Sequence, residues 1–335
     1  MRQYSEFLKS RCPKPLVVST GLNMSGLNMG GGSGSSSSGG GGSVVYRLPQ
    51  GDEVAICYLV NTGEYCSTVV PQLESMIKGK MDPVFADKVD LDPEVEVFYD
   101  LVAHALKVLV AGILDRLEPA FKAMQAVPWA SLAQVNEESQ YIHMCNAALT
   151  EATARIRESL AESYFRIFCT KLATDVLQRY LDVIMRQKRI AEVGSQQLLL
   201  DTYNIKTLLL HLQNLGMSAQ DTRPPVPPVY TKLVMARIAH IETVLKLVGT
   251  PEELLVERFR IMWPEGSGPD LQSILALKGL KKADQASILD SLGRHGPANA
   301  SQGGALAGQN SGHASDPPPP PPPPPPSAFQ CRALA

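Results

Sequence analysis

The residues in this sequence that could carry chemistry begin with a run of acids between residues 87 and 94. Four carboxylates in eight positions could hold a calcium ion. A calcium-binding loop, however, requires Gly at its sixth position and Glu at its twelfth. Counted from Asp90, those positions hold Val95 and Leu101. We therefore interpret the acids as a capped, solvated helix start, in which carboxylates lie near the positive end of the helix.

Histidine and cysteine also lack the spacing of a metal or catalytic site. The four histidines within helical stretches have no cysteine or acid at ligand spacing, and we expect them to be packing or surface residues: His104, His143, His211 and His240. The cysteines show no C-x-x-C pair and are expected to be reduced core residues: Cys12, Cys57, Cys66, Cys145, Cys169 and Cys331. No esterase, phosphate-loop or zinc-protease motif is present. The sequence predicts no catalytic residue, no metal and no cofactor.

A small basic cluster is the remaining candidate site. Lys278, Lys281 and Lys282 surround Gly279 between two short predicted helices. Such a charge run is usually a solvated helix start. The alternative is a docking patch for an acidic partner or for lipid head groups. These three lysines are therefore the candidate partner-binding residues.

Helical periodicity dominates the chain, and strand-type alternation is rare. Val54, Tyr58, Tyr65, Val69 and Met76 recur at helical spacing in a helix predicted over 52–80. A second helix is expected to begin at 92 and to kink or end at residue 119. The other predicted helices cover 136–159, 163–189, 196–215, 229–249, a helix capped at Thr250, 270–277 and 282–292. These patterns predict an all-α fold of stacked helical bundles.

Composition divides the chain into five parts. Residues 1–22 are expected to form a short helix and an extended segment, and 23–43 a Gly/Ser-rich linker. Two helical bundles are predicted over 44–190 and 191–294, followed by a disordered tail over 295–335 with ten prolines at 317–326. The net charge of −2 gives no reason to expect nucleic-acid binding. The most apolar stretch, 101–114, is too short to span a bilayer.

Several blocks of sequence resemble a known family in the same order along the chain. They are EVAICYLVNTGEYC (53–66), VPWASL (127–132), GSQQLLLDTYNIKTL (194–208), the segment 230–250, and LALKGLKKADQ (275–285). These blocks are similar to the vacuolar protein sorting-associated protein 53 family, a subunit of the Golgi-associated retrograde protein complex. The Gly/Ser segment and the proline run are not part of that pattern, and the family's N-terminal half has no counterpart in this sequence.

The resemblance implies a non-catalytic role in vesicle tethering during endosome-to-trans-Golgi retrograde transport. It implies helical rods, a peripheral place on the cytosolic face of trans-Golgi and endosome membranes, and no cofactor. The implied partners are other subunits of that complex and of its endosomal relative, SNAREs and small GTPases. Two alternatives stay open: a GTPase regulator acting through Arg258 or Arg260, and an adaptor that presents the proline run.

Overall fold

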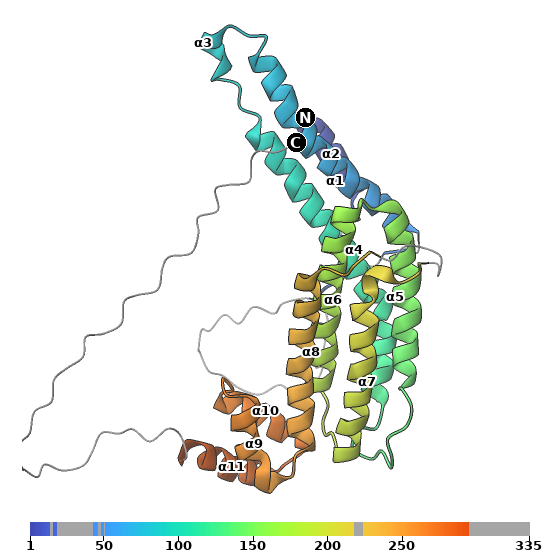
Figure 1. The fold of residues 1–335 in the computed structure, drawn as a ribbon, viewed down its shortest axis with the longest axis vertical. Helices are drawn as coiled ribbons and strands as arrows, with labels where there is room; N and C mark the ends of the chain where they lie inside the picture. Colours follow the sequence, from blue (N-terminus) through green and yellow to red (C-terminus); the bar gives the residue numbers. More distant parts are fainter. Residues whose placement is uncertain (14–15, 19–42, 46–47, 50, 218–223, 295–335) are drawn as a thin grey trace, which may run out of the picture. The chain divides into compact units, whose positions relative to one another are not determined.

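The computed structural model describes residues 1–13, 16–18, 43–45, 48–49, 51–217 and 224–294. The described residues fold mainly into helices, as the sequence predicts (Figure 1). The longer helices are α1 (Arg2–Arg11), α2 (Asp52–Lys78), α4 (Asp92–Ala126), α5 (Gln140–Ser159), α6 (Glu162–Met185), α7 (Glu192–Leu210), α8 (Pro228–Gly249), α9 (Glu252–Met262), α10 (Gly268–Lys278) and α11 (Lys282–Arg294). The short helix α3 (Pro83–Ala86) and the 3-10 turn η1 (Leu212–Asn214) complete the set.

One strand pair was not expected from the sequence. β1 (Leu16–Val18) and β2 (Ser43–Val45) pair antiparallel, with Leu16 opposite Val45 and Val18 opposite Ser43. Four of the six strand residues are valines, but three-residue strands are too short to show alternation. Ser43, the last residue assigned to the expected linker, therefore lies in a strand. Most of that linker and the proline run lie outside the described residues.

Helices α2 and α4 lie side by side as a long hairpin with α3 at its turn (Figure 1). Gly63 allows the two helices to approach closely, because a Cβ there would lie 2.6 Å from Cγ2 of Val102. Helix α4 continues through Pro119 to Ala126, so of the two outcomes expected there, a kink or an end, the helix does not end. Pro71 lies inside α2 in the same way.

Helix α4 is the central element of the core. It contacts α1, α2, α5 and α6, and its apolar residues are largely buried. The apolar stretch 101–114 lies within the longer helix α4, which by length and composition could cross a membrane, so the expectation drawn from that stretch alone was too narrow. More than half of its most apolar window is buried against other helices, which is typical of a core helix.

Helices α7 and α8 form the second close pair, joined to the first by α5, α6 and η1. Residues 1–294 form one compact unit. The boundary expected at 190/191 falls between α6 and α7, and helices from both sides of it contact each other within that unit. That α7–α11 would form a separate bundle stays a prediction.

Local hydrogen bonds at the caps determine where the C-terminal helices begin and end. The expected cap at Thr250 was wrong: its hydroxyl donates to the carbonyl of Lys246, and α9 begins after Pro251. A capping box is found instead at Ser267 and Asp270, at the start of α10. Helix α10 ends at Gly279, whose φ of 77° is left-handed and favours glycine.

Candidate interaction surface

The three candidate lysines occupy different environments. Lys278 is half-buried, and its Nζ donates to the carbonyl oxygens of Val248 at 2.9 Å and Thr250 at 2.6 Å. Burial lowers the pKa of Lys278, although nearby acids oppose this effect. Lys278 therefore binds the C-terminal end of α8 and holds α10 against it.

Lys281 and Lys282 are exposed at the beginning of α11. Cations are disfavoured there, because the N-terminal end of a helix carries partial positive charge. Neither side chain has an ion pair or hydrogen bond within the described residues. Helix stability therefore does not explain these two lysines.

The structure brings a second group of cations next to this turn. Arg189 packs against Gly279, where a Cβ would lie 2.8 Å from Cδ of Arg189. Arg186 and Lys188 precede it in the exposed loop between α6 and α7. These three residues help to line a hollow of about 270 Å³ beside Trp129. We call the five exposed cations the basic rim: Arg186, Lys188, Arg189, Lys281 and Lys282.

Sequence reasoning missed the loop cations because it assigned them to the end of a helix predicted to run to 189. Helix α6 ends at Met185. The signal was present as three cations in the four residues 186–189. Two tertiary contacts join this group to the turn before α11: Arg189 packs on Gly279, and the backbone N–H of Ile190 donates to the carbonyl of Leu277 at 2.8 Å.

The acid cluster lies at the start of a helix, as expected, but it also joins that helix to α2. Carboxylate oxygens of Glu74, Asp90 and Asp92 lie within 4.8 Å of one another. Glu74 accepts from the backbone N–H of Leu91 and pairs with Lys78, while Asp90 accepts from the N–H of Asp92. These bonds satisfy donors at the start of α4 and tie α2 to it. The N-cap position itself is Leu91, so Asp92 is the first helical residue and does not cap α4 as expected.

The described cysteines are free, as expected: four are buried and Cys66 is half-buried. Burial raises the pKa of Cys57, Cys145 and Cys169 to about 12, so these thiols stay protonated. All four helical histidines are exposed, and His240 packs edge-on against Trp263. Arg260 donates to the carbonyl of Leu292, whereas Arg258 is exposed.

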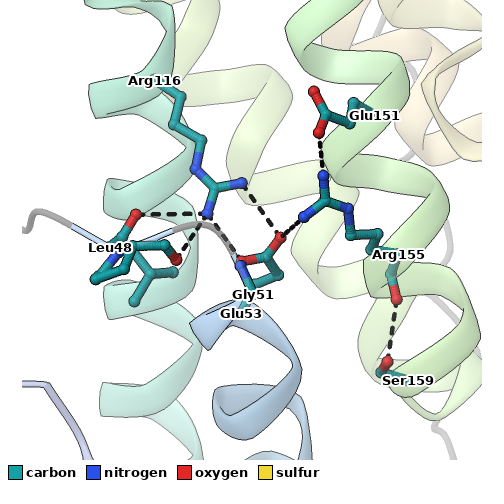
Figure 2. A network of polar contacts seen from close by, with 8 residues as sticks. Leu48, Gly51, Glu53, Arg116, Glu151, Arg155 and Ser159 are labelled. Carbon is teal, nitrogen blue, oxygen red and sulfur yellow. Dashed lines mark hydrogen bonds and ion pairs between the residues drawn. The ribbon is translucent and has the colours of Figure 1, made fainter.

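Glu53, one of two fully buried acids among the described residues, is also structural. Glu53 is fully buried at the start of α2 and binds Arg116 from α4 at 2.8 Å and Arg155 from α5 at 3.2 Å (Figure 2). Arg116 also donates to the carbonyls of Leu48 and Pro49. Burial would raise the pKa of Glu53, but hydrogen bonds from Arg116 and from backbone N–H groups hold that pKa below its usual value. We call this cluster the Glu53 junction.

A second buried carboxylate, Asp201, lies in one of the blocks that carry the resemblance. Asp201 accepts from the backbone and hydroxyl of Ser139 and from the hydroxyl of Tyr141, at 2.7–3.0 Å. On the same side of α7, Gly194 lies so close to Trp129 that a Cβ would meet its carbonyl oxygen at 2.2 Å. These blocks therefore position the loop before α5 on α7.

Helix α2 has two apolar faces, and only one is covered. Ile56, Val60 and Val70 are buried toward the core. Tyr58 and Met76 are each 60% exposed and Tyr65 is 68% exposed. Their spacing of seven and eleven residues places them together on the side opposite the buried face. The apolar periodicity found in the sequence thus belongs largely to an outward surface, which we call the α2 stripe.

Comparisons with known proteins identify relatives over most of the chain. Residues 2–228 match the family described as exocyst complex component Sec6, and residues 196–280 match the vacuolar protein sorting-associated protein 53 C-terminus. Vacuolar protein sorting-associated protein 53 A of Arabidopsis thaliana is 34% identical over 261 residues, which is 78% of this chain and 31% of that protein.

The homolog of vacuolar protein sorting-associated protein 53 in Caenorhabditis elegans is 28% identical over 249 residues, which is 73% of this chain and 30% of that protein. The chain therefore spans about a third of the length of these curated relatives. The Glu53 junction and the rim residues Arg186, Lys188 and Arg189 lie within the first matched region, whereas Lys281 and Lys282 lie just beyond the end of the second.

Proposed function

Because the chain belongs to the vacuolar protein sorting-associated protein 53 family, we propose that it is a non-catalytic part of a vesicle-tethering complex. Its proposed role is in endosome-to-trans-Golgi retrograde transport, at the cytosolic face of those membranes. The proposed partners are other subunits of the Golgi-associated retrograde protein complex and its endosomal relative, SNAREs and small GTPases. The match to an exocyst component supports assembly into a larger complex.

The observation that carries this proposal is the basic rim. It combines cations from two loops that lie far apart in sequence, and these cations form no ion pair within the described residues. An acidic surface on a partner would complement the rim and speed the encounter. The rim therefore favours an electrostatic contact with a partner protein rather than a chemical reaction.

The α2 stripe supplies a second contact of different character. Tyrosine and methionine are enriched at protein interfaces because they bury large apolar area. Two modest contacts on one chain can together give firm but reversible attachment. This arrangement fits a tether, which must hold its partners and later release them.

A co-precipitation experiment with the full 335-residue chain tests the rim. The test variant changes Lys188, Lys281 and Lys282 to Glu, and the control changes the exposed Lys80, Lys107 and Lys122 to Glu with the same change in charge. We expect the test variant to lose tethering subunits, SNAREs or Golgi GTPases from cell extract, and the control to retain them. Lys278 is left unchanged because its bonds to α8 are structural.

Two results would contradict the proposal. Equal recovery of these partners by both variants would show that the rim is only a solvated surface. Rim-dependent binding of the purified chain to anionic vesicles, without recovery of any protein partner, would show that the rim contacts lipid head groups instead.

A further inference from the structure

Two neighbouring hollows lie beside the N-terminal half of α6. Neither is lined by a residue of the basic rim or of the α2 stripe. The first has a volume of about 370 Å³ and includes Arg157, Phe165 and Leu160. The second, of about 390 Å³, is largely apolar and includes Ile167 and Val229. Arg166 and Gln213 line both hollows, so the two are neighbours. We call the combined surface the α6 trough.

Arg157 has no acid bound to it within the described residues. Its guanidinium lies over the ring of Phe165, with Cζ 4.5 Å from the ring centroid. Its Nε and Nη2 atoms are buried and have no hydrogen-bond partner. Burial lowers the pKa of Arg157, although the nearby Cys169 and Glu162 oppose this effect. The aromatic contact fixes the position of this cation but leaves its donors unused.

Gln213 adds a second unused donor at the point where the hollows meet. Its side chain is only 5% exposed, and its Nε2 has no partner within the described residues. Buried polar groups in native proteins are nearly always paired. A buried amide N–H and a buried guanidinium, both unpaired beside one hollow, indicate that an acceptor from elsewhere belongs there.

The other part of the trough is suited to an apolar side chain. Val229 is 80% exposed and Ile167 is 42% exposed, although both stand beside the largely apolar second hollow. Lys171 flanks this hollow with further positive charge, whereas Arg166 is paired with Glu162 at the edge of the first hollow. The trough thus offers unpaired donors on one side and an open apolar surface on the other.

We propose that the α6 trough binds a short acidic segment of a partner protein, in which a carboxylate lies beside a bulky apolar side chain. The carboxylate accepts hydrogen bonds from Arg157 and Gln213. A planar guanidinium suits a carboxylate because its N–H groups can donate to both carboxylate oxygens. The apolar side chain covers Ile167 and Val229 in the second hollow. A flat bilayer surface fits less well, since its head groups cannot enter a concave site to reach buried donors. This site is separate from the basic rim and does not depend on it.

Peptide display tests this inference with the full chain. A random 12-residue library is selected on the wild-type protein, and the recovered peptides are measured by fluorescence anisotropy against three variants. We expect selected peptides to combine Asp or Glu with a large apolar residue. Arg157→Met and Val229→Asp are each expected to weaken binding by about tenfold or more. The exposed Arg237→Met is the matched control and should bind like the wild type.

Val229→Asp keeps the test valid if Arg157→Met fails to fold, because a side chain that is 80% exposed tolerates a polar replacement. Selected peptides without acids, or equal binding by Arg157→Met, Val229→Asp and the control, would overturn the inference. Binding of vesicles containing 20% phosphatidylserine that is lost in Arg157→Met, together with failure to select any peptide, would assign the trough to lipid instead. Loss of the basic rim should leave peptide binding unchanged, so the two proposals can fail independently.

Discussion

The Glu53 junction and the α6 trough both gather arginines between helices, but they differ in where the acceptors come from. At the junction, the Glu53 carboxylate binds guanidinium groups from α4 and α5, and two backbone carbonyls accept from Arg116 (Figure 2). In the trough, Arg157 stacks on Phe165 without any bound acid among the described residues. The first cluster is closed within the chain and holds helices together, whereas the second leaves donors for a partner.

The largest effect that can test this contrast is expected at Glu53. Glu53→Leu leaves Arg116 and Arg155 between helices without their shared carboxylate. Loss of one member of a buried ion pair costs about 3 kcal/mol or more of unfolding free energy. Urea unfolding of the full chain, followed by circular dichroism, measures the change. Glu162→Leu is the control, because the Glu162–Arg166 pair is exposed and should contribute about 0.5 kcal/mol or less.

A smaller loss is expected where one donor is removed from the other closed network. Tyr141→Phe keeps the buried ring but removes the hydroxyl that donates to Asp201 at 2.8 Å. The carboxylate retains other donors, so we expect a loss of about 1–2 kcal/mol. The exposed Tyr203→Phe should change the unfolding free energy little. If Tyr141→Phe lowers the unfolding free energy no more than Tyr203→Phe does, the hydrogen bond to Asp201 does not help to hold the helices together.

The pH dependence of the Glu53 junction gives a third test. The pKa of Glu53 is lower in the folded chain than its ordinary value of 4.5, so the unfolded chain binds the proton more readily. The stability due to this shift is fully present above the ordinary value and is lost as the pH falls through the folded pKa. The difference in unfolding free energy between wild type and Glu53→Gln should therefore decrease below about pH 4.5. A difference that stays constant from pH 7 to pH 3 would argue against a charged Glu53.

The smallest effect is expected in the trough. Arg157→Met preserves an apolar stem over Phe165 and removes a charge that burial disfavours. We expect the unfolding free energy to change by no more than about 0.5 kcal/mol. Arg116→Met at the junction should cost clearly more, because it leaves Glu53 short of a donor. If the two substitutions cost the same, Arg157 has a structural acceptor and the contrast between the two clusters is wrong.

Much of the fold could be predicted from the sequence because helical periodicity is a local property. The helices over 52–78, 140–159 and 228–249 begin and end within a few residues of their expected limits. The resemblance to the vacuolar protein sorting-associated protein 53 family was also confirmed. Capping was less predictable: Thr250 has a capping sequence, yet the box forms at Ser267. Competing local hydrogen bonds decide between such sites.

The candidate site was predicted only in part. Lys281 and Lys282 are exposed as a docking patch requires, but Lys278 is bound to the end of α8. Nothing in the sequence near residue 278 indicates that bond, since Val248 and Thr250 lie in another helix. The loop cations at 186–189 were visible in the sequence, but their position beside the turn at 279 was not.

The sequence by itself determined the helices, the lack of any recognised catalytic motif and the family to which the chain belongs. These follow from residue types and spacing along the chain. The tertiary structure alone decided which face of α2 is buried, which lysine is structural, and which arginines have acceptors. Burial and hydrogen bonding depend on residues that are distant in sequence, so a residue's role as a support or as a contact is decided only when the helices pack.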